Sequence, residues 1–162
     1  MSDWLSDDEQ RTWRSVLRMH THLTTALAQA LKTDSDMSIP DYEVLAILSE
    51  APQRTLRARE LRCALMWEKS RLAHHIRRME QRGYVHRATC DDDARAPLIS
   101  LTETGLAAIR AAAPAHVARV RELFFAALTP AQAQAMREAA EAVLENLARH
   151  EPEEPDTAAD AA

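Results

Sequence analysis

Six side chains that can bond to nucleic acid lie between residues 69 and 78, at positions that one face of a helix would present. They are Lys69, Ser70, Arg71, His74, Arg77 and Arg78. Arginine can donate two parallel hydrogen bonds to guanine O6 and N7, and serine and histidine can reach base edges or phosphates. The set predicts a helix that reads double-stranded DNA in the major groove. The alternative interpretation is a solvated basic face, which is common on ordinary helices.

Positive charge continues on both sides of this segment. Arg57 and Arg59 precede it, and Arg95 follows at the tip of an expected hairpin. Residues 54–95 hold eleven Lys or Arg against six acids, whereas the rest of the 162-residue chain holds nine basic and nineteen acidic residues. A basic module of charge +5 in a frame of charge −10 is typical of a nucleic-acid-binding protein. The segregation therefore favours DNA binding over the solvated face.

The sequence shows no pattern that would support catalysis or metal binding. A glycine-rich phosphate loop, a Ser/His/Asp arrangement and a paired-carboxylate signature are all missing. His74 and His75 are adjacent, and His20 and His22 are two residues apart. On a helix the imidazoles of either pair point in different directions, so neither pair can easily bind one metal ion. We therefore expect no catalytic residues, no metal and no cofactor.

Two cysteines occur, and both are expected to be free thiols in a reducing compartment. Cys63 lies beside the apolar side of a short helix, which favours a buried and inert thiol. Cys90 lies near Arg87 and Arg95, which would lower its pKa, but the acids at 91–93 oppose them. Its redox activity stays open. An acidic N-terminus and the lack of an apolar run of ~18 residues predict a cytoplasmic protein without a membrane segment.

The elements around these side chains are mostly helical, since only two glycines occur and Ala, Leu, Arg and Glu are abundant. Ser6 and Glu9 form a capping box that begins a helix ending near Leu31, with residues 33–36 as a loop. A second helix begins at Ser38, with a proline in its first turn. Helices over 57–65 and 68–82 then make a helix-turn-helix, and the latter ends at Gly83.

After residue 83 the apolar period changes from 3.6 to 2, which predicts strands over 84–88 and 97–101 that form a two-stranded wing. Thr102 and Thr129 begin two further helices. The fold class is mainly α with a small β-wing. We divide the chain into an N-terminal dimerisation helix (1–37), a winged helix-turn-helix domain (38–101, recognition helix 68–82, wing 84–101), C-terminal dimerisation helices (102–150) and an acidic, disordered tail (151–162).

The segment from Asp93-Ala94-Arg95 through Leu101-Thr102 to Gly105 resembles the wing signature of MarR-type regulators, and residues 69–85 resemble their recognition helix and its exit. The resemblance covers nearly the whole chain. It implies a homodimer whose first and last two helices interlock, with two winged domains on a palindrome. It also implies that Arg95 enters the minor groove and that Asp93 orients it.

A further expectation concerns a small ligand. Related proteins often bind small aromatic or anionic effectors, and a cleft between the first two helices could be lined by Trp13, Arg14, Arg18, His20 and Tyr42. Plain core packing of Trp13 and Tyr42 is the alternative, and it is slightly favoured. The sequence thus predicts a dimeric transcription regulator, a repressor that recognises an inverted repeat and is released by a ligand. A helical dimerisation or adaptor protein without DNA binding is the alternative function.

Overall fold

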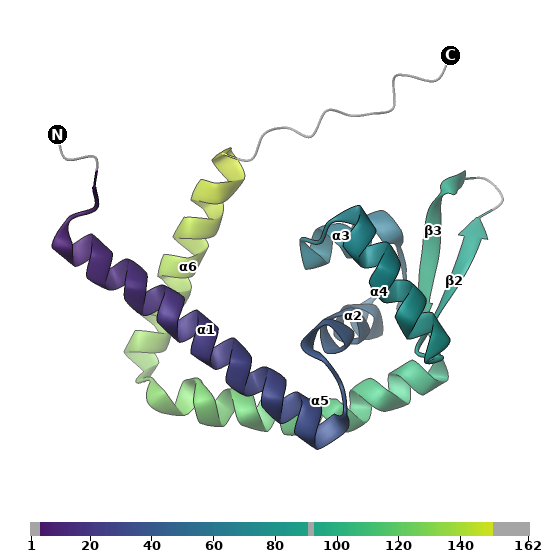
Figure 1. The fold of residues 1–162 in the computed structure, drawn as a ribbon, viewed down its shortest axis with the longest axis horizontal. Coiled ribbons are helices and arrows are strands. Elements are labelled where there is room, and N and C mark those ends of the chain that lie inside the picture. Colours follow the sequence, from purple (N-terminus) through teal and green to yellow (C-terminus); the bar gives the residue numbers. More distant parts are fainter. Residues whose placement is uncertain (1–3, 91–92, 151–162) are drawn as a thin grey trace, which may run out of the picture. The chain divides into compact units, whose positions relative to one another are not determined.

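A computed structural model describes residues 4–90 and 93–150, and the side chains of residues 89–96 lie outside this description. The chain forms two compact units, residues 1–121 and 122–162. Its elements are α1 (Asp7–Ser35), α2 (Ile39–Glu50), β1 (Thr55–Arg57), α3 (Ala58–Leu65), α4 (Lys69–Gln81), β2 (Val85–Cys90), β3 (Asp93–Leu101), α5 (Glu103–Leu123) and α6 (Pro130–His150), with short 3-10 helices at Pro52–Arg54 and Phe125–Ala127 (Figure 1). The expected fold class, mainly α with a small β-wing, is confirmed.

Helix α1 begins where its capping box places it. The amide of Glu9 donates to Ser6 Oγ (3.3 Å), and the amide of Ser6 donates to the Glu9 carboxylate (2.7 Å). The helix continues to Ser35, so the predicted end near Leu31 is wrong by one turn. Asp36 adopts the left-handed conformation (φ 52°) that ends it, and its carboxylate pairs with Lys32.

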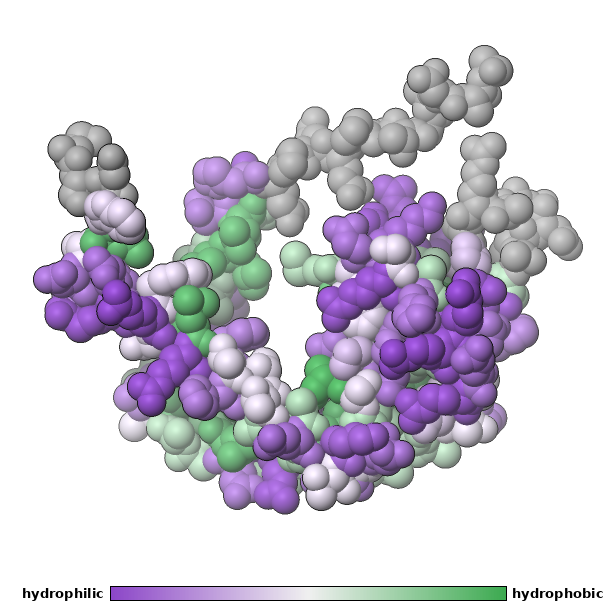
Figure 2. Space-filling model, in the orientation of Figure 1, coloured by the Kyte–Doolittle hydropathy of each residue, from purple (hydrophilic) through white to green (hydrophobic). Residues whose placement is uncertain are grey.

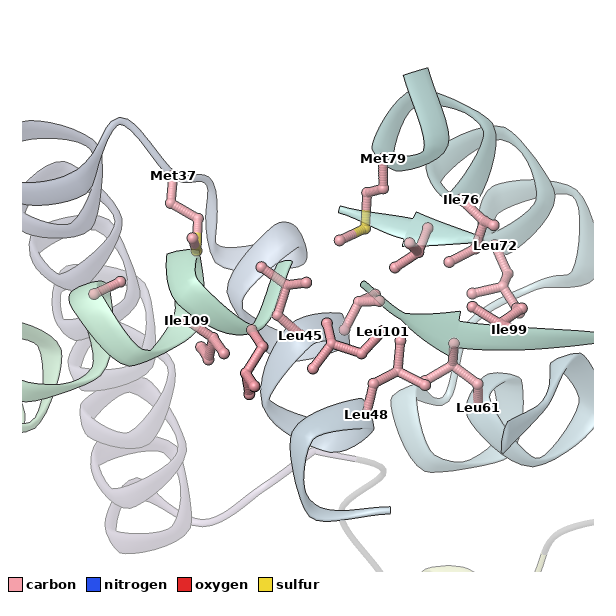
Figure 3. Close-up of a cluster of buried hydrophobic side chains, with 14 of the residues drawn as sticks. Met37, Leu45, Leu48, Leu61, Leu72, Ile76, Met79, Ile99, Leu101 and Ile109 are labelled. Carbon is pink, nitrogen blue, oxygen red and sulfur yellow. The ribbon is translucent and has the colours of Figure 1, made fainter. Parts of the chain in front are cut away.

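Helix α2 forms the centre of the core in the first unit. It begins with a second capping box, in which the Asp41 amide donates to Ser38 Oγ (3.2 Å). Its side chains Val44, Leu45 and Leu48 are fully buried. Figure 3 shows Leu45 and Leu48 among apolar side chains that come from α3, α4, α5 and the sheet.

Helices α3 and α4 are joined by a tight turn at Met66 and Trp67. Met66 adopts the left-handed conformation (φ 53°), and the Trp67 amide donates back to the Arg62 carbonyl (3.1 Å). At the other end of α4, Gly83 has φ 73°, and the Tyr84 amide donates to the Met79 carbonyl (3.0 Å). The predicted helix-turn-helix is confirmed.

The sheet has three antiparallel strands in the order β1-β3-β2, one more than expected. Strand β1 pairs Thr55 with Ser100 and Leu56 with Ile99, and the two hydroxyls of the first pair lie 2.9 Å apart. Three residues are too few to show a period of 2, so the pattern could not predict this strand. Strands β2 and β3 form the expected wing, with an irregular register between Ala88 and Cys90.

The wing is joined to α5 through Thr102 and Gly105. The Thr102 hydroxyl donates to the Gly83 carbonyl (2.7 Å), and its oxygen accepts from the Gly105 amide (3.0 Å). A Cβ at position 105 would lie 2.1 Å from the Tyr84 carbonyl oxygen. Glycine is therefore required here by the close approach of two backbone segments.

The apolar side chains of α5 are divided along its length. Leu106, Ile109 and Ala112 are buried in the core of the first unit, so the first half of α5 stabilises the winged domain. Further along, Val117 is exposed. In the second unit, α6 begins with the predicted capping box of Thr129 and Gln132, and it buries no residue completely.

Candidate nucleic-acid interface

Helix α4 presents a polar face to solvent and an apolar face to the core. Leu72, Ile76 and Met79 are buried as predicted. All six side chains expected to contact the major groove are exposed: Lys69, Ser70, Arg71, His74, Arg77 and Arg78. Figure 2 shows hydrophilic side chains gathered over this part of the first unit. The helix is thus held from behind while its basic side chains face outward.

The other expected DNA-contacting residues belong to α3 and the wing. Arg57 and Arg59 are exposed at the start of α3, where the Arg57 amide donates to the Glu60 carboxylate (2.8 Å). The backbone of Asp93 and Arg95 lies in β3, at the end of the wing away from Leu101. Their side chains lie outside the described residues. The role of each residue in DNA contact stays a prediction.

One buried face of α4 carries a polar network that the sequence analysis missed. Asp41, which is 3% exposed, contacts two residues of α4 and its exit: its Oδ1 lies 3.0 Å from His75 Nε2, and its Oδ2 accepts from Arg82 Nη1 at 2.8 Å. Burial acts to raise the pKa of Asp41, but the contacts with His75, Ser38 and Arg82 outweigh burial and hold it far below its usual range. Asp41 is therefore a buried carboxylate that ties the recognition helix to the start of α2.

The same network reaches the exposed face of α4 through Trp67. The indole ring is buried and packs edge-on against His75, with ring centroids 5.2 Å apart. On its other side, the guanidinium carbon of Arg71 lies 4.3 Å from a ring centroid of Trp67. A possible signal in the sequence was the position of His75, three residues after Leu72 and four before Met79 on the apolar stripe.

The structure does not bring together the side chains of the expected ligand cleft. Trp13 is 55% exposed on α1, and Arg14, Arg18 and His20 are exposed on the same helix. Tyr42, however, packs on His116 (4.3 Å between ring centroids), one turn before Arg119, which pairs with Asp34 at the far end of α1.

Along a helix, the 21 residues from Trp13 to Asp34 span roughly 30 Å. Within one chain Trp13 and Tyr42 therefore cannot line the same small cleft, and a shared cleft would need a second protomer. The burial of Tyr42, which raises the pKa of its hydroxyl, agrees with core packing of this residue, whereas core packing is wrong for Trp13, which is exposed. A shallow hollow on α1 is lined by Ser15, Arg18, Met19 and His22.

Cysteine and metal chemistry add little to this site. Cys63 is a free thiol and is exposed, so the expectation of a buried thiol is wrong: the apolar face of α3 is formed by Leu61 and Leu65, and Cys63 lies off it. The Cys90 side chain lies outside the described residues. Among the described side chains, those of residues 4–88 and 97–150, no cluster of three His, Cys, Asp or Glu could hold a metal ion. In the same ranges, no helix combines the length and apolarity needed to cross a bilayer.

Comparison with known proteins finds that the chain is similar to members of one protein family. The model of the MarR family matches residues 37–96. The chain is similar to AbsC, a MarR family transcriptional regulator from Streptomyces coelicolor, at 38% identity over 93% of this chain and 100% of that chain (TM-score 0.86). It is similar to Sco3205 of the same organism, determined in complex with DNA, at 36% identity over 96% of both chains (TM-score 0.87).

The fold extends to more distant structures. A mutant MarR from E. coli complexed with operator DNA is 21% identical over 81% of this chain and 91% of that chain, with a TM-score of 0.70. A search of curated proteins finds no match.

Proposed function

Because the chain belongs to the MarR family of transcription regulators, we propose that it is a cytoplasmic homodimeric repressor that binds an inverted repeat in double-stranded DNA and is released by a small aromatic or anionic ligand. Membership of this family establishes that the chain is a DNA-binding transcription regulator. Repression, recognition of an inverted repeat, dimerisation and release by a ligand are what we propose in addition.

One observation carries the DNA interface. Helix α4 exposes six polar or basic side chains while Leu72, Ile76 and Met79 fix its opposite face in the core. A helix anchored in this way can enter a major groove without losing its own packing. The relative Sco3205 was determined in complex with DNA, which supports the same use of this chain.

The dimer is supported by apolar side chains that each unit leaves in solvent. On α1, Trp13 is 55% exposed, and Val16 and Leu17 are 46% exposed. On α6, Leu144 and Leu147 are more than half exposed. Such surfaces on helices are covered by a partner in stable proteins, and a second copy of the chain is the simplest one. Two copies would also supply the two recognition helices that an inverted repeat requires.

The DNA proposal is tested with a duplex selected from a random library by the wild-type protein. Fluorescence anisotropy should give a dissociation constant far lower than that for a scrambled duplex. Arg95→Ala should weaken binding strongly while circular dichroism stays that of the wild type, because the arginine is proposed to enter the minor groove. Unchanged affinity of this variant would remove the role of Arg95. Enrichment of no sequence would favour the adaptor function instead.

The dimer is tested separately. Leu144→Glu should lower the mass measured by light scattering from two chains to one, because a charge would be placed in the proposed interface. Glu141→Gln, an exposed position on the same helix, is the matched control and should leave the mass unchanged. A dimeric Leu144→Glu protein would place the interface elsewhere.

The repressor and the ligand are tested in cells and in solution. A reporter gene behind the selected operator should be silenced by the wild-type chain and not by Arg95→Ala. An aromatic acid such as salicylate should raise the dissociation constant for the operator, since a ligand that prefers the DNA-free dimer shifts its population. Arg18→Ala should remove that effect without changing the affinity for DNA in the absence of ligand.

A further inference from the structure

Arg71 is the exposed arginine of α4 that lies on an aromatic ring. Its guanidinium carbon is 4.3 Å from the ring centroid of Trp67, four residues earlier. No other hydrogen bond or ion pair of this guanidinium is found among the residues that the structure describes. Its hydrogen-bond donors are therefore available, while its guanidinium rests over the indole ring.

Trp67 is itself fixed from behind. It is 6% exposed and packs edge-on against His75, and His75 lies 3.0 Å from the buried carboxylate of Asp41. The attraction between an exposed cation and an aromatic face is enough to favour one orientation of a flexible side chain. Arg71 thus rests on a rigid platform that reaches the core through three consecutive contacts.

The chemistry of this arrangement differs from that of a phosphate contact. A phosphate attracts any positive charge from many directions, so a fixed guanidinium plane adds little. Guanine presents O6 and N7 in one plane, and two parallel N–H bonds from arginine must lie in that plane. Stacking on an indole face leaves the N–H edge of the guanidinium free for such a pair.

We propose that Arg71 reads a guanine in the major groove and determines the base preference at that position, with Trp67 as the positioning residue that presents its guanidinium. This assignment rests on the proposed function and deepens it, because it names the specificity residue within the DNA interface.

The first test measures base preference rather than affinity. The wild-type protein is used to select a duplex from a random library, and anisotropy is then measured on all single-base-pair variants of that duplex. A bidentate arginine–guanine pair discriminates by roughly 5- to 150-fold against other base pairs. Arg71→Ala and Arg71→Lys should both reduce the preference at one G·C pair per half-site to less than about 3-fold. Lysine keeps the charge but not the planar fork.

Arg59→Ala is the matched control. Arg59 is an exposed arginine on α3, and its loss should weaken binding to all variants by a similar factor, with the preference profile unchanged. Retention of the full G·C preference in Arg71→Lys and Arg71→Ala would overturn the proposal. If the wild-type protein selected no sequence at all, the proposed function would fail and not merely the role of Arg71.

The second test concerns Trp67. Trp67→Leu keeps an apolar but smaller side chain and removes the aromatic face, and Trp67→Phe keeps a face. Leucine should weaken the preference at the Arg71 base pair several-fold, leave the other positions unchanged and have no further effect in an Arg71→Ala background. Phenylalanine should restore most of the preference. An equal loss at every position in both Trp67 variants would indicate a purely structural role and overturn the positioning assignment.

Discussion

Replacing Asp41 with asparagine tests the buried network beneath the recognition helix. Asparagine keeps the size of the side chain and one acceptor oxygen, but it removes the negative charge that faces Arg82 Nη1 at 2.8 Å and His75 Nε2 at 3.0 Å. Breaking one side of a buried ion pair costs about 3–5 kcal/mol. The Arg82 side chain is 39% exposed, so water solvates the charge left behind. We expect a loss of about 2 kcal/mol in the free energy of unfolding, the lower end for charge-assisted hydrogen bonds.

The pH dependence has a definite sign. The pKa of Asp41 in the native protein lies below its unfolded value of about 3.9, so the carboxylate contributes its full stabilisation above that value. As the pH falls from about 5 towards 2, the unfolded chain takes up a proton at this site while the native carboxylate stays ionised, so unfolding becomes more favourable and the advantage of the wild type over Asp41→Asn should shrink. Asparagine does not titrate, so the difference between the two proteins isolates this carboxylate.

Urea unfolding followed by far-UV circular dichroism at pH 7 and pH 3 measures the difference, at one fixed protein concentration because the proposed dimer would make stability depend on concentration. A loss of 2 kcal/mol corresponds to a fall in Tm of roughly 4–8 °C. Asp36→Asn is the matched control: Asp36 is exposed, and asparagine tolerates its left-handed backbone, so no measurable change is expected. Equal stability of Asp41→Asn and wild type at pH 7, or a gap at pH 3 as large as that at pH 7, would refute the reasoning.

Three further predictions concern the backbone and the charge of the winged domain. Gly105→Ala should destabilise the protein by more than about 2 kcal/mol in thermal melts, because the added Cβ would lie 2.1 Å from a backbone oxygen. Gly83→Ala should destabilise it by only about 1 kcal/mol, because position 83 has open space and only its φ of 73° is unfavourable for alanine. Equal losses in the two variants would contradict the close contact at position 105. Met66→Gly should leave urea stability unchanged or raise it by about 0.5 kcal/mol, since Met66 is exposed at φ 53°; a marked loss would show that its side chain packs. The logarithm of the association constant for operator DNA should fall linearly with the logarithm of the salt concentration, with a slope of about 0.9 per phosphate contact. Arg59→Ala should make this slope shallower by about one. An affinity that does not change with salt would exclude an electrostatic interface.

The helix starts could be predicted from the sequence because a capping box is local. Ser6 with Glu9 begins α1 as the sequence indicated. Helix α2 also begins at Ser38 as expected from its first-turn proline, and the structure adds a capping box between Ser38 and Asp41. The end of α1 could not be predicted in this way. It depends on Asp36 adopting a left-handed conformation, and residues 33–35 carry types that are equally common in loops.

The exposed basic side chains of α4 could be predicted from charge and helical period, whereas the buried polar contacts beneath them could not. Asp41, His75 and Arg82 are separated by 34 and 7 residues, and no local pattern relates a capping aspartate to a histidine on another helix. Asp41 also served two purposes at once, as the third residue of a capping box and as the partner of α4. The local purpose was visible in the sequence and concealed the tertiary one.

A polar contact on the buried face of α4 has a consequence that apolar packing lacks. Leu72, Ile76 and Met79 would keep most of their burial if α4 rotated or slid slightly, because apolar contact is not directional. The hydrogen bond from Arg82 to Asp41, beside the 3.0 Å contact of Asp41 with His75, tolerates less displacement, because the energy of a hydrogen bond depends on its distance and direction. A helix that only had to be stable could do without it. If the outward side chains of α4 contact base edges, as proposed, the helix needs a fixed rotation about its own axis, and Asp41 supplies that constraint on its buried face.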